Sequence, residues 1–218
     1  MRIDLHTHSI LSDGELTPSE LVRRAMVLEH DAIAITDHVD MTNVDIVVPA
    51  IVKAAELSNE YIRTIPGAEI THVPPKLMKK VIKRAKELGA KWIVVHGETV
   101  SEPVIKGTNL EAASNPDVNV LAHPGIITDK EMQKAVENNV LIEITGRAHH
   151  NITNGHVVNV ARKFNAKMIV NSDCHAPGDL MNRERAMKVA LGAGMTEEEA
   201  AEAIDVTPFK TLKDLGLW

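Results

Sequence analysis

Six of the eleven histidines in this 218-residue chain stand where a short apolar run ends, and three acidic residues stand in equivalent places. A single histidine at the end of a strand is more often structural. Six of them with three acids would crowd unpaired polar groups and charge at one rim, which metal ions relieve. Imidazole and carboxylate ligands without thiolates suit Zn, Mn or Fe. The sequence therefore predicts a hydrolase with two or three divalent metal ions, held by His6, His8, Asp13, His38, Glu69, His96, His123, Asp173 and His175.

The spacing within two of these motifs supports metal binding. In Asp4-Leu5-His6-Thr7-His8 the two-residue period of a strand puts both imidazoles on one face. In Thr36-Asp37-His38 we interpret His38 as the ligand and Asp37 as the acceptor that orients it.

Two residues near these motifs have an ordinary alternative. Asp13 lies in Ser12-Asp13-Gly14, where an Asp-Gly pair on its own favours a turn. Cys174 alternates away from Asp173 and His175, so we expect a packed thiol rather than a nucleophile.

Apolar runs rich in Val, Ile and Leu recur between longer helical patterns, which is typical of βα repetition with buried parallel strands. The candidate ligands follow nearly every strand, and only a closed ring would bring them together. We therefore predict an α/β protein with a TIM-like barrel of seven strands. The strands are expected near 2–5, 32–36, 62–68, 91–95, 118–122, 140–144 and 167–171, and helices near 18–29, 45–60, 76–88, 129–138, 154–165 and 180–192, with at most a short helix between 97 and 116.

Local signals at the helix ends support this phasing. Gly89 and either Asn138 or Asn139 suit left-handed helix caps. His30 holds the equivalent place after the first helix, and we interpret it as a capping or surface residue. Three threonines stand three residues before a glutamate, as in a capping box: Thr17, Thr128 and Thr196.

Length and composition indicate one domain over residues 1–218, with 207–218 as a C-terminal tail. Trp218 either packs on the barrel or lies in a subunit contact, which leaves a homo-oligomer open. No apolar run approaches the roughly 18 residues of a membrane span, and no signal peptide precedes the first strand. With a single cysteine, the protein is expected to be soluble and cytoplasmic.

The charge balance bears on the partner. A formal net charge of −6 and only 2% aromatic residues argue against long nucleic acid, which needs basic surface and stacking platforms. A small phosphorylated substrate remains open, because a few local cations and metals can hold it.

These motifs, in order from Met1 to about Leu191, resemble the PHP (polymerase and histidinol phosphatase) superfamily. The resemblance implies a distorted (βα)7 barrel with up to three metals at its carboxyl-end mouth. It puts one metal on His6, His8, Glu69 and Asp173, a second on Glu69, His96 and His123 with Glu69 bridging, and a third on Asp13, His38 and His175. Many relatives have histidine at the position of Asp13, which implies a weaker or differently selective third site. No family ligand is missing, which argues against a metal-free relative such as the barrel subunit of archaeal ribonuclease P.

The expected activity is hydrolysis of a small phosphate monoester, in the manner of a histidinol phosphatase. A metal-activated hydroxide would attack phosphorus, and Glu69 and Asp173 would hold the metals that activate it. His72, three residues beyond Glu69, could protonate the leaving group or bind substrate. Loop cations could bind the phosphate, namely Arg147, His149 and His150 after the sixth strand and Arg183 and Arg185 after the last ligand pair.

Three other functions are consistent with parts of the sequence. A phosphodiesterase or exonuclease acting on short oligonucleotides would use the same chemistry. An amidohydrolase-type barrel also begins with H-x-H, but it usually has a bridging lysine at the fourth strand, where this chain has His96, and it lacks the closing Asp-x-His. A non-catalytic barrel subunit would bind no metal.

Overall fold

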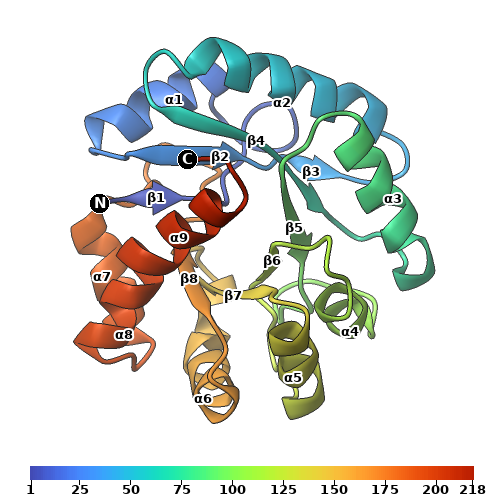
Figure 1. Ribbon diagram of the computed structural model, residues 1–218, viewed down its shortest axis with the longest axis vertical. Coiled ribbons are helices and arrows are strands. Elements are labelled where there is room, and N and C mark those ends of the chain that lie inside the picture. The colour runs from blue at the N-terminus through green and yellow to red at the C-terminus, as the bar shows by residue number, and fades with distance from the viewer.

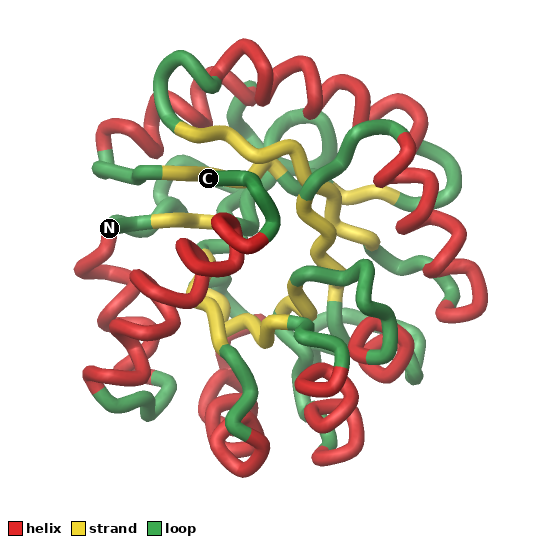
Figure 2. Tube along the Cα trace, viewed as in Figure 1, coloured by secondary structure: helices red, strands yellow, loops and turns green.

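The computed structural model describes residues 1–218. Its parallel strands curl into a nearly closed barrel, and most helices lie outside them (Figures 1 and 2). The strands are β1 (Ile3–Asp4), β2 (Ala32–Ile35), β3 (His38–Val39), β4 (Arg63–Ile70), β5 (Trp92–His96), β6 (Val120–Ala122), β7 (Leu141–Thr145) and β8 (Met168–Asn171). The predicted seven-stranded barrel is confirmed, and each predicted strand end lies within two residues of the observed one.

The α-helices alternate with the strands up to residue 192 as predicted, and two further helices that lie outside the predicted ranges follow in residues 197–214, part of which was expected to be a C-terminal tail. The helices are α1 (Pro18–Val27), α2 (Val44–Ser58), α3 (Pro75–Glu87), α4 (Thr108–Ala113), α5 (Asp129–Glu137), α6 (Asn154–Phe164), α7 (Arg183–Gly192), α8 (Glu197–Ala201) and α9 (Thr207–Asp214). A 3-10 turn spans His150–Thr153, and a π-helical turn spans Glu202–Val206. None of these helices combines the length and apolar character needed to cross a bilayer.

Strand β3 is a continuation of β2 that the sequence did not indicate. Ile35 pairs with Pro66 and His38 pairs with Glu69, so the register is unchanged across a two-residue interruption. The continuation matters because it places His38 beside Glu69.

Side chains close the seam between β8 and β1, where the backbone makes one isolated bridge, between Thr7 and Cys174. Arg2 is buried there and donates from Nη1 to the Val170 carbonyl at 2.9 Å, while its Nη2 lies 2.6 Å from Asp4 Oδ2. Asn171 Oδ1 accepts from the backbone N–H of Leu5 at 3.0 Å. These bonds satisfy polar groups that a missing ladder would otherwise leave unpaired.

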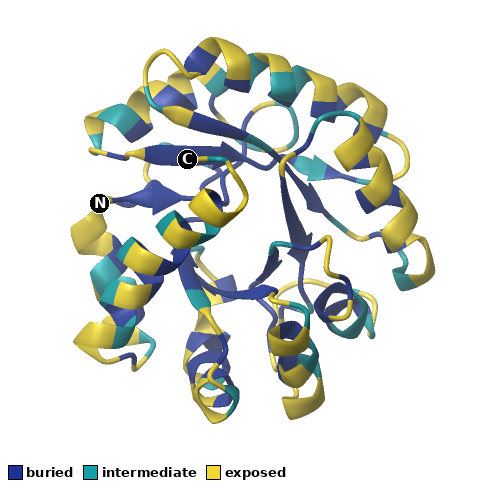
Figure 3. Cartoon of the chain, viewed as in Figure 1, coloured by how far each residue is buried: buried dark blue, intermediate teal, exposed yellow.

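Buried residues fill the strands and the helix sides that face them (Figure 3), and the apolar ones among them form two layers. The larger layer lies between strands and helices, and a cluster of 12 buried residues fills the barrel interior. Leu212 of α9 belongs to this inner cluster, and Phe209 and Leu217 pack against it. The C-terminal helix thus covers the amino-terminal end of the barrel. Trp218 packs edge-on against Phe209, with ring centroids 5.0 Å apart.

Most of the helix-end predictions are confirmed. Thr128 and Thr196 form complete capping boxes. Thr17 also caps its helix, but the box stays open because the Glu20 carboxylate accepts from Arg24 instead, at 2.9 and 3.0 Å. Gly89 and Asn139 have the expected positive φ, 109° and 58°.

The interpretation of His30 was wrong. Helix α1 ends at Val27, so the left-handed position falls on Glu29, with φ 60°. His30 is buried, and its Nδ1 lies 3.0 Å from the Ala25 carbonyl.

Candidate metal centre

The inner faces of the strands change character toward their carboxyl ends. Ile65, Val94, Leu141 and Ile169 belong to the apolar cluster inside the barrel. Because residues two and four apart share a face of a strand, the next inward positions continue that face. These positions hold Glu69, His96, Glu143 and Asp173, all of them buried. The ordinary alternation of a strand therefore delivers titratable side chains to one end of the barrel.

Four predicted ligands of the first metal converge on one point. Glu69 Oε2 lies 3.2 Å from His6 Nε2 and 3.4 Å from His8 Nε2. Asp173 Oδ1 lies 3.6 and 3.2 Å from the same two nitrogens. Ligand atoms bound tetrahedrally at 2.0–2.1 Å would lie about 3.3 Å apart, so the spacing fits a Zn-sized ion.

The other oxygen of Glu69 faces a second set. Glu69 Oε1 lies 3.4 Å from His96 Nδ1 and 3.5 Å from His123 Nε2. Both Glu69 oxygens are buried and face imidazole nitrogens, with His38 Nδ1 2.8 Å from Oε2, and a buried carboxylate is costly unless a cation or a protonated partner offsets its charge. One carboxylate could therefore bridge two ions.

A third set lies at the outer edge of the cluster. Asp13 Oδ1 is 3.5 Å from His38 Nε2 and 3.3 Å from His175 Nε2. The His8 ring stacks on that of His175, with centroids 4.1 Å apart. The Asp13 side chain is 57% exposed, in contrast to the buried Glu69 and Asp173.

Asp37 does not orient His38, contrary to the sequence interpretation. Its carboxylate accepts from the backbone and hydroxyl groups of Ser9 and Ser12 at 2.8–3.0 Å, which holds the loop that carries Asp13. The Nδ1 of His38 instead lies 2.6 Å from Thr71 Oγ1 and 2.8 Å from Glu69 Oε2. Cys174 is buried as expected, and burial raises the pKa of its thiol.

Glu143 was missed by the sequence reasoning. Its Oε1 lies 2.7 Å from His6 Nδ1 and accepts from Asn171 Nδ2 at 3.0 Å, while Oε2 accepts from the backbone N–H of His123 at 3.1 Å. A signal for it was present in the sequence, because an acid stands in the middle of the apolar run Leu-Ile-Glu-Ile. It lies two residues after Leu141 and therefore on the same, inward face of the strand.

Glu102, in the loop between β5 and α4, was also missed. Its Oε2 lies 3.0 Å from His96 Nε2 and 3.5 Å from His72 Nε2, and its Oε1 lies 3.3 Å from His150 Nε2. Contact with His96 lowers the pKa of Glu102 to about 2. No periodic signal marks this loop, so only the folded chain reveals the cluster.

The charges of the cluster are strongly coupled. Burial alone would raise the pKa of Glu69, but His6 and His38 hold that pKa well below its usual range. Burial would lower the pKa of His6, and Glu143 and Glu69 override it, so this pKa lies well above its usual value. Burial and neighbouring His38 lower the pKa of His8 to about 3. Without metal, protons on a few imidazoles offset the carboxylates, and cations could replace those protons.

Two of the predicted metal ligands and two further histidines at the barrel mouth have strained backbone conformations. Seven non-glycine residues have positive φ, and four of them are His72, His123, His149 and Asp173. The other three follow helices α1, α5 and α6. Such conformations are sparsely populated and tend to persist where the surrounding structure enforces a functional geometry.

The predicted substrate-binding residues are divided between two places. Arg147 Nη1 lies 3.0 Å from Asp179 Oδ2, which also accepts from the backbone N–H of His175, so Arg147 stands beside the cluster. His149 is exposed, and its carbonyl accepts from Ser101 Oγ. Arg183 is not brought to the mouth. It is held by Asp205, whose carboxylate lies 3.7 Å from the N-terminal amine at the opposite end of β1.

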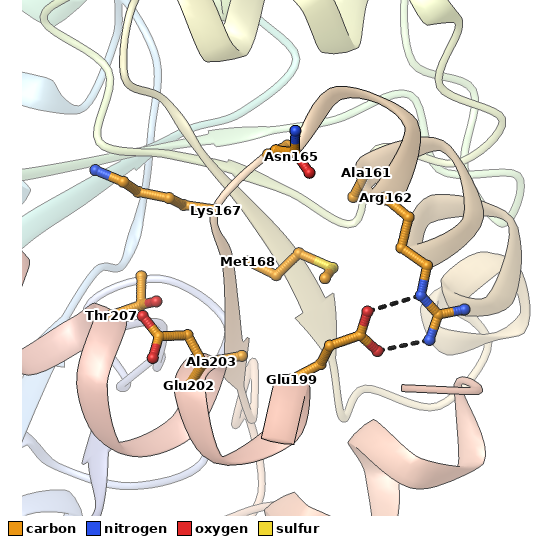
Figure 4. A pocket seen from close by; sticks show the side chains of 10 residues that line it. Ala161, Arg162, Asn165, Lys167, Met168, Glu199, Glu202, Ala203 and Thr207 are labelled. Carbon is orange, nitrogen blue, oxygen red and sulfur yellow. Dashed lines mark hydrogen bonds and ion pairs between the residues drawn. The ribbon is translucent and has the colours of Figure 1, made fainter. Parts of the chain in front are cut away.

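A surface hollow lies between α6, β8 and the C-terminal helices (Figure 4). It is lined by Met168, the first residue of β8, and by the Arg162–Glu199 ion pair. It contains no histidine and opens at the amino-terminal side of the sheet, so it does not compete with the metal centre.

A model of the PHP domain matches residues 4–96 of this chain. An uncharacterized protein of Methanocaldococcus jannaschii is 50% identical over 216 residues, covering 98% of this chain and 99% of its own. The chain belongs to the PHP family. Ribonuclease P protein component 3 of Methanosarcina barkeri, another relative of this PHP protein, is 25% identical over 94% of this chain and 86% of its own.

Two further relatives match shorter parts of the chain, and one solved structure matches nearly all of it. The 5'-3' exoribonuclease Rnm of Salmonella typhimurium is 43% identical over 70 residues, 32% of this chain and 22% of its own. A probable phosphatase of Thermoanaerobacter is 31% identical over 100 residues, 41% of each chain. A chain of archaeal ribonuclease P with mature tRNA superimposes with a TM-score of 0.73 at 17% identity, covering 98% of this PHP chain and 91% of that chain, which shows a shared fold.

Proposed function

We propose that this protein is a metal-dependent phosphoesterase that hydrolyses a small phosphate monoester. The observation that supports this most strongly is Glu69, whose two oxygens face two separate ligand sets at 3.2–3.5 Å. A buried carboxylate shared by two cations is the arrangement expected of two-metal hydrolysis of phosphate esters.

The ligand sets would hold two or three divalent ions of Zn, Mn or Fe type. When bound, such ions lower the pKa of water and neutralise charge on phosphoryl oxygens. Glu69 and Asp173 keep the ions at fixed separation, and His6, His8, His96 and His123 complete the two inner sets. Asp13, His38 and His175 would hold the third ion. The exposure of Asp13 supports a weaker third position.

Residues around the mouth would handle the substrate. His72 is half-exposed, and its ring centroid lies 5.3 Å from that of the buried His96, so it can donate a proton to a leaving group beside the metals. Arg147, with His149 behind it in the loop after β7, would bind a phosphoryl oxygen. No protein nucleophile is required.

The test is metal removal followed by add-back. The protein is stripped with a chelator, assayed against a panel of metabolite phosphomonoesters, and reassayed with Zn, Mn or Fe restored. We expect turnover to disappear with the metals and to return with at least one of them. Full activity in the exhaustively stripped protein would contradict the proposal.

A second candidate is an exonuclease that acts on short oligonucleotides. The match to an exoribonuclease over 70 residues supports it, and the chemistry at the metals would be the same. Short oligoribonucleotides in the same panel separate the two. Release of mononucleotides faster than hydrolysis of every monoester would favour the exonuclease.

A non-catalytic role in an RNA–protein assembly is the third candidate, supported by the ribonuclease P relatives. It predicts that the purified protein contains no tightly bound metal. Elemental analysis of the protein as purified tests that outcome directly.

A further inference from the structure

Two carboxylates that are not in the predicted ligand sets contact the far side of two ligand histidines. Glu143 faces His6, and Glu102 faces His96. The role of these contacts rests on the proposed metal centre, because it concerns how the individual metal positions are held.

The first contact determines which nitrogen of His6 can bind a metal. An ionised carboxylate can only accept, so the 2.7 Å contact requires a proton on His6 Nδ1. The Nε2 lone pair then points to Glu69 and Asp173, at 3.2 and 3.6 Å. Glu143 is buried and is itself held by Asn171 and by the backbone of His123. It therefore has little freedom to move.

The second contact repeats this arrangement at His96. Its Nδ1 lies 3.4 Å from Glu69 Oε1, and its Nε2 lies 3.0 Å from Glu102 Oε2. A neutral imidazole has one lone pair and one N–H. If Nδ1 binds the ion beside Glu69, Nε2 must carry the proton and donate it to Glu102. A separate ion held jointly by His72, His96 and Glu102 is therefore excluded while the second position is filled.

The two carboxylates differ in how they are supported. Glu143 lies on strand β7, whereas Glu102 lies on a loop and its side chain is 38% exposed. Glu102 also contacts His72 and His150, at 3.5 and 3.3 Å, which come from two other loops. Glu102 therefore links the outer loops to a ligand of the second set only.

We propose that Glu102 is the positioning residue of the second metal position, formed by Glu69, His96 and His123, and that Glu143 is the positioning residue of the first. Acceptors behind a ligand histidine fix its tautomer and ring orientation, and their loss typically lowers metal affinity about 10- to 100-fold. Because the two carboxylates contact different histidines, each position should be weakened independently.

The experiment measures metal equivalents per chain by elemental analysis after equilibration at a series of free-metal concentrations. Glu102→Ala should weaken one equivalent by about 10- to 100-fold and leave the others unchanged. Glu102→Gln retains an acceptor oxygen and should restore part of the affinity. Glu143→Gln should weaken a different equivalent, with the thermal transition checked because Glu143 is buried.

A double variant identifies the position that is lost. His123→Ala removes a ligand of the second set, so adding Glu102→Ala to it should remove no further equivalent. Added to His6→Ala, it should remove one more. Additive loss with His123→Ala would overturn the assignment.

The matched control is Glu98→Gln in the same loop. Glu98 accepts from the backbone N–H groups of Gly107 and Asn109 and contacts none of the imidazoles in the cluster. It should retain all equivalents, and a loss equal to that of Glu102→Ala would assign the effect to loop order and overturn the proposal. If wild-type protein binds no metal, the metal centre fails. If it binds metal and Glu102→Ala keeps every equivalent, only this inference fails.

Discussion

Glu69 is the residue at which the two proposed inner ligand sets meet. Every other inner ligand belongs mainly to one side, but the two oxygens of Glu69 face both. Removal of its charge should therefore affect two positions together, whereas loss of a histidine should affect one.

We expect Glu69→Gln to lose more than one metal equivalent. Its kcat/KM should fall by roughly 10³-fold or more, because charge stabilisation by metals is worth several kcal/mol. Elemental analysis and steady-state kinetics measure both effects. Glu56→Gln, on the exposed face of α2, serves as the matched control and should change neither quantity. A Glu69→Gln protein with full metal content would contradict the bridging role.

The residues at the mouth should separate catalysis from metal binding. His72→Ala should lower kcat by about 10²-fold if it acts as a general acid, with metal content unchanged. Arg147→Ala should raise KM for the phosphate substrate. Arg183→Ala is the comparison, since Arg183 lies beside the N-terminus and should leave the kinetics unchanged. Wild-type kinetics for both variants would show that neither His72 nor Arg147 takes part in catalysis or substrate binding.

At the scale of elements, the two ends of the barrel differ in the side chains that they carry. The carboxyl ends of the strands carry the polar cluster, while α9 covers the amino-terminal end and inserts Leu212 into the inner apolar cluster. Because the two ends are far apart, a substitution at the amino-terminal end should change the free energy of unfolding without altering the polar cluster. Most of the chain's apolar packing lies outside the ring, between strands and helices.

We expect Leu212→Ala to destabilise the protein by about 2–5 kcal/mol, since it removes a fully buried leucine and leaves a cavity. Denaturant unfolding measures the change. Leu215→Ala on the same segment, where the side chain is 48% exposed, should stay within about 0.5 kcal/mol. Equal effects of the two would mean that α9 does not seal the barrel.

At the scale of the whole molecule, folding brings together imidazoles whose pKa values move in opposite directions. Burial and cationic neighbours lower the pKa of His8 to about 3 and that of His150 to about 4. Burial opposes the rise at His96, but Glu102 and Glu69 raise its pKa to about 10. The pH dependence of stability follows from these differences.

We expect the metal-free protein to be most stable near pH 6.5, the ordinary pKa of histidine. Below that pH, histidines in the unfolded chain become protonated, whereas folded His8 and His150 stay neutral because their pKa values are lower. The free energy of unfolding therefore falls as the pH falls toward about 3. The Glu102 contribution is present above its ordinary pKa and is lost as the pH falls through about 2. The His96 contribution is present below about pH 6.5 and is lost as the pH rises through about 10.

Urea unfolding of the stripped protein at acidic, neutral and alkaline pH measures this dependence. Bound metal should flatten the alkaline side, because ligand histidines must be unprotonated to bind it and binding releases their protons. A stability that rises steadily from neutral to alkaline pH in the stripped protein would contradict the charge assignments.

The sequence by itself determined the seven strands of the barrel, two of the three expected capping boxes and the list of candidate ligands. Each of these depends on a few neighbouring residues, through the two-residue period of strands or the hydrogen bonds of a helix end. Local patterns also have limits, since α1 ends two residues earlier than predicted and the left-handed position falls on Glu29 rather than on His30.

Only the tertiary structure decided which groups stand behind the ligands. Glu143 meets His6, and Glu102 meets His96, His72 and His150, through loops and strands that are distant along the chain. Arg183 is a further example. It follows the last candidate ligands in the sequence, but in the structure it pairs with Asp205 beside the N-terminus, at the amino-terminal end of the barrel. Contacts of this kind depend on the paths of loops between elements, and residue periodicity contains no information about those paths.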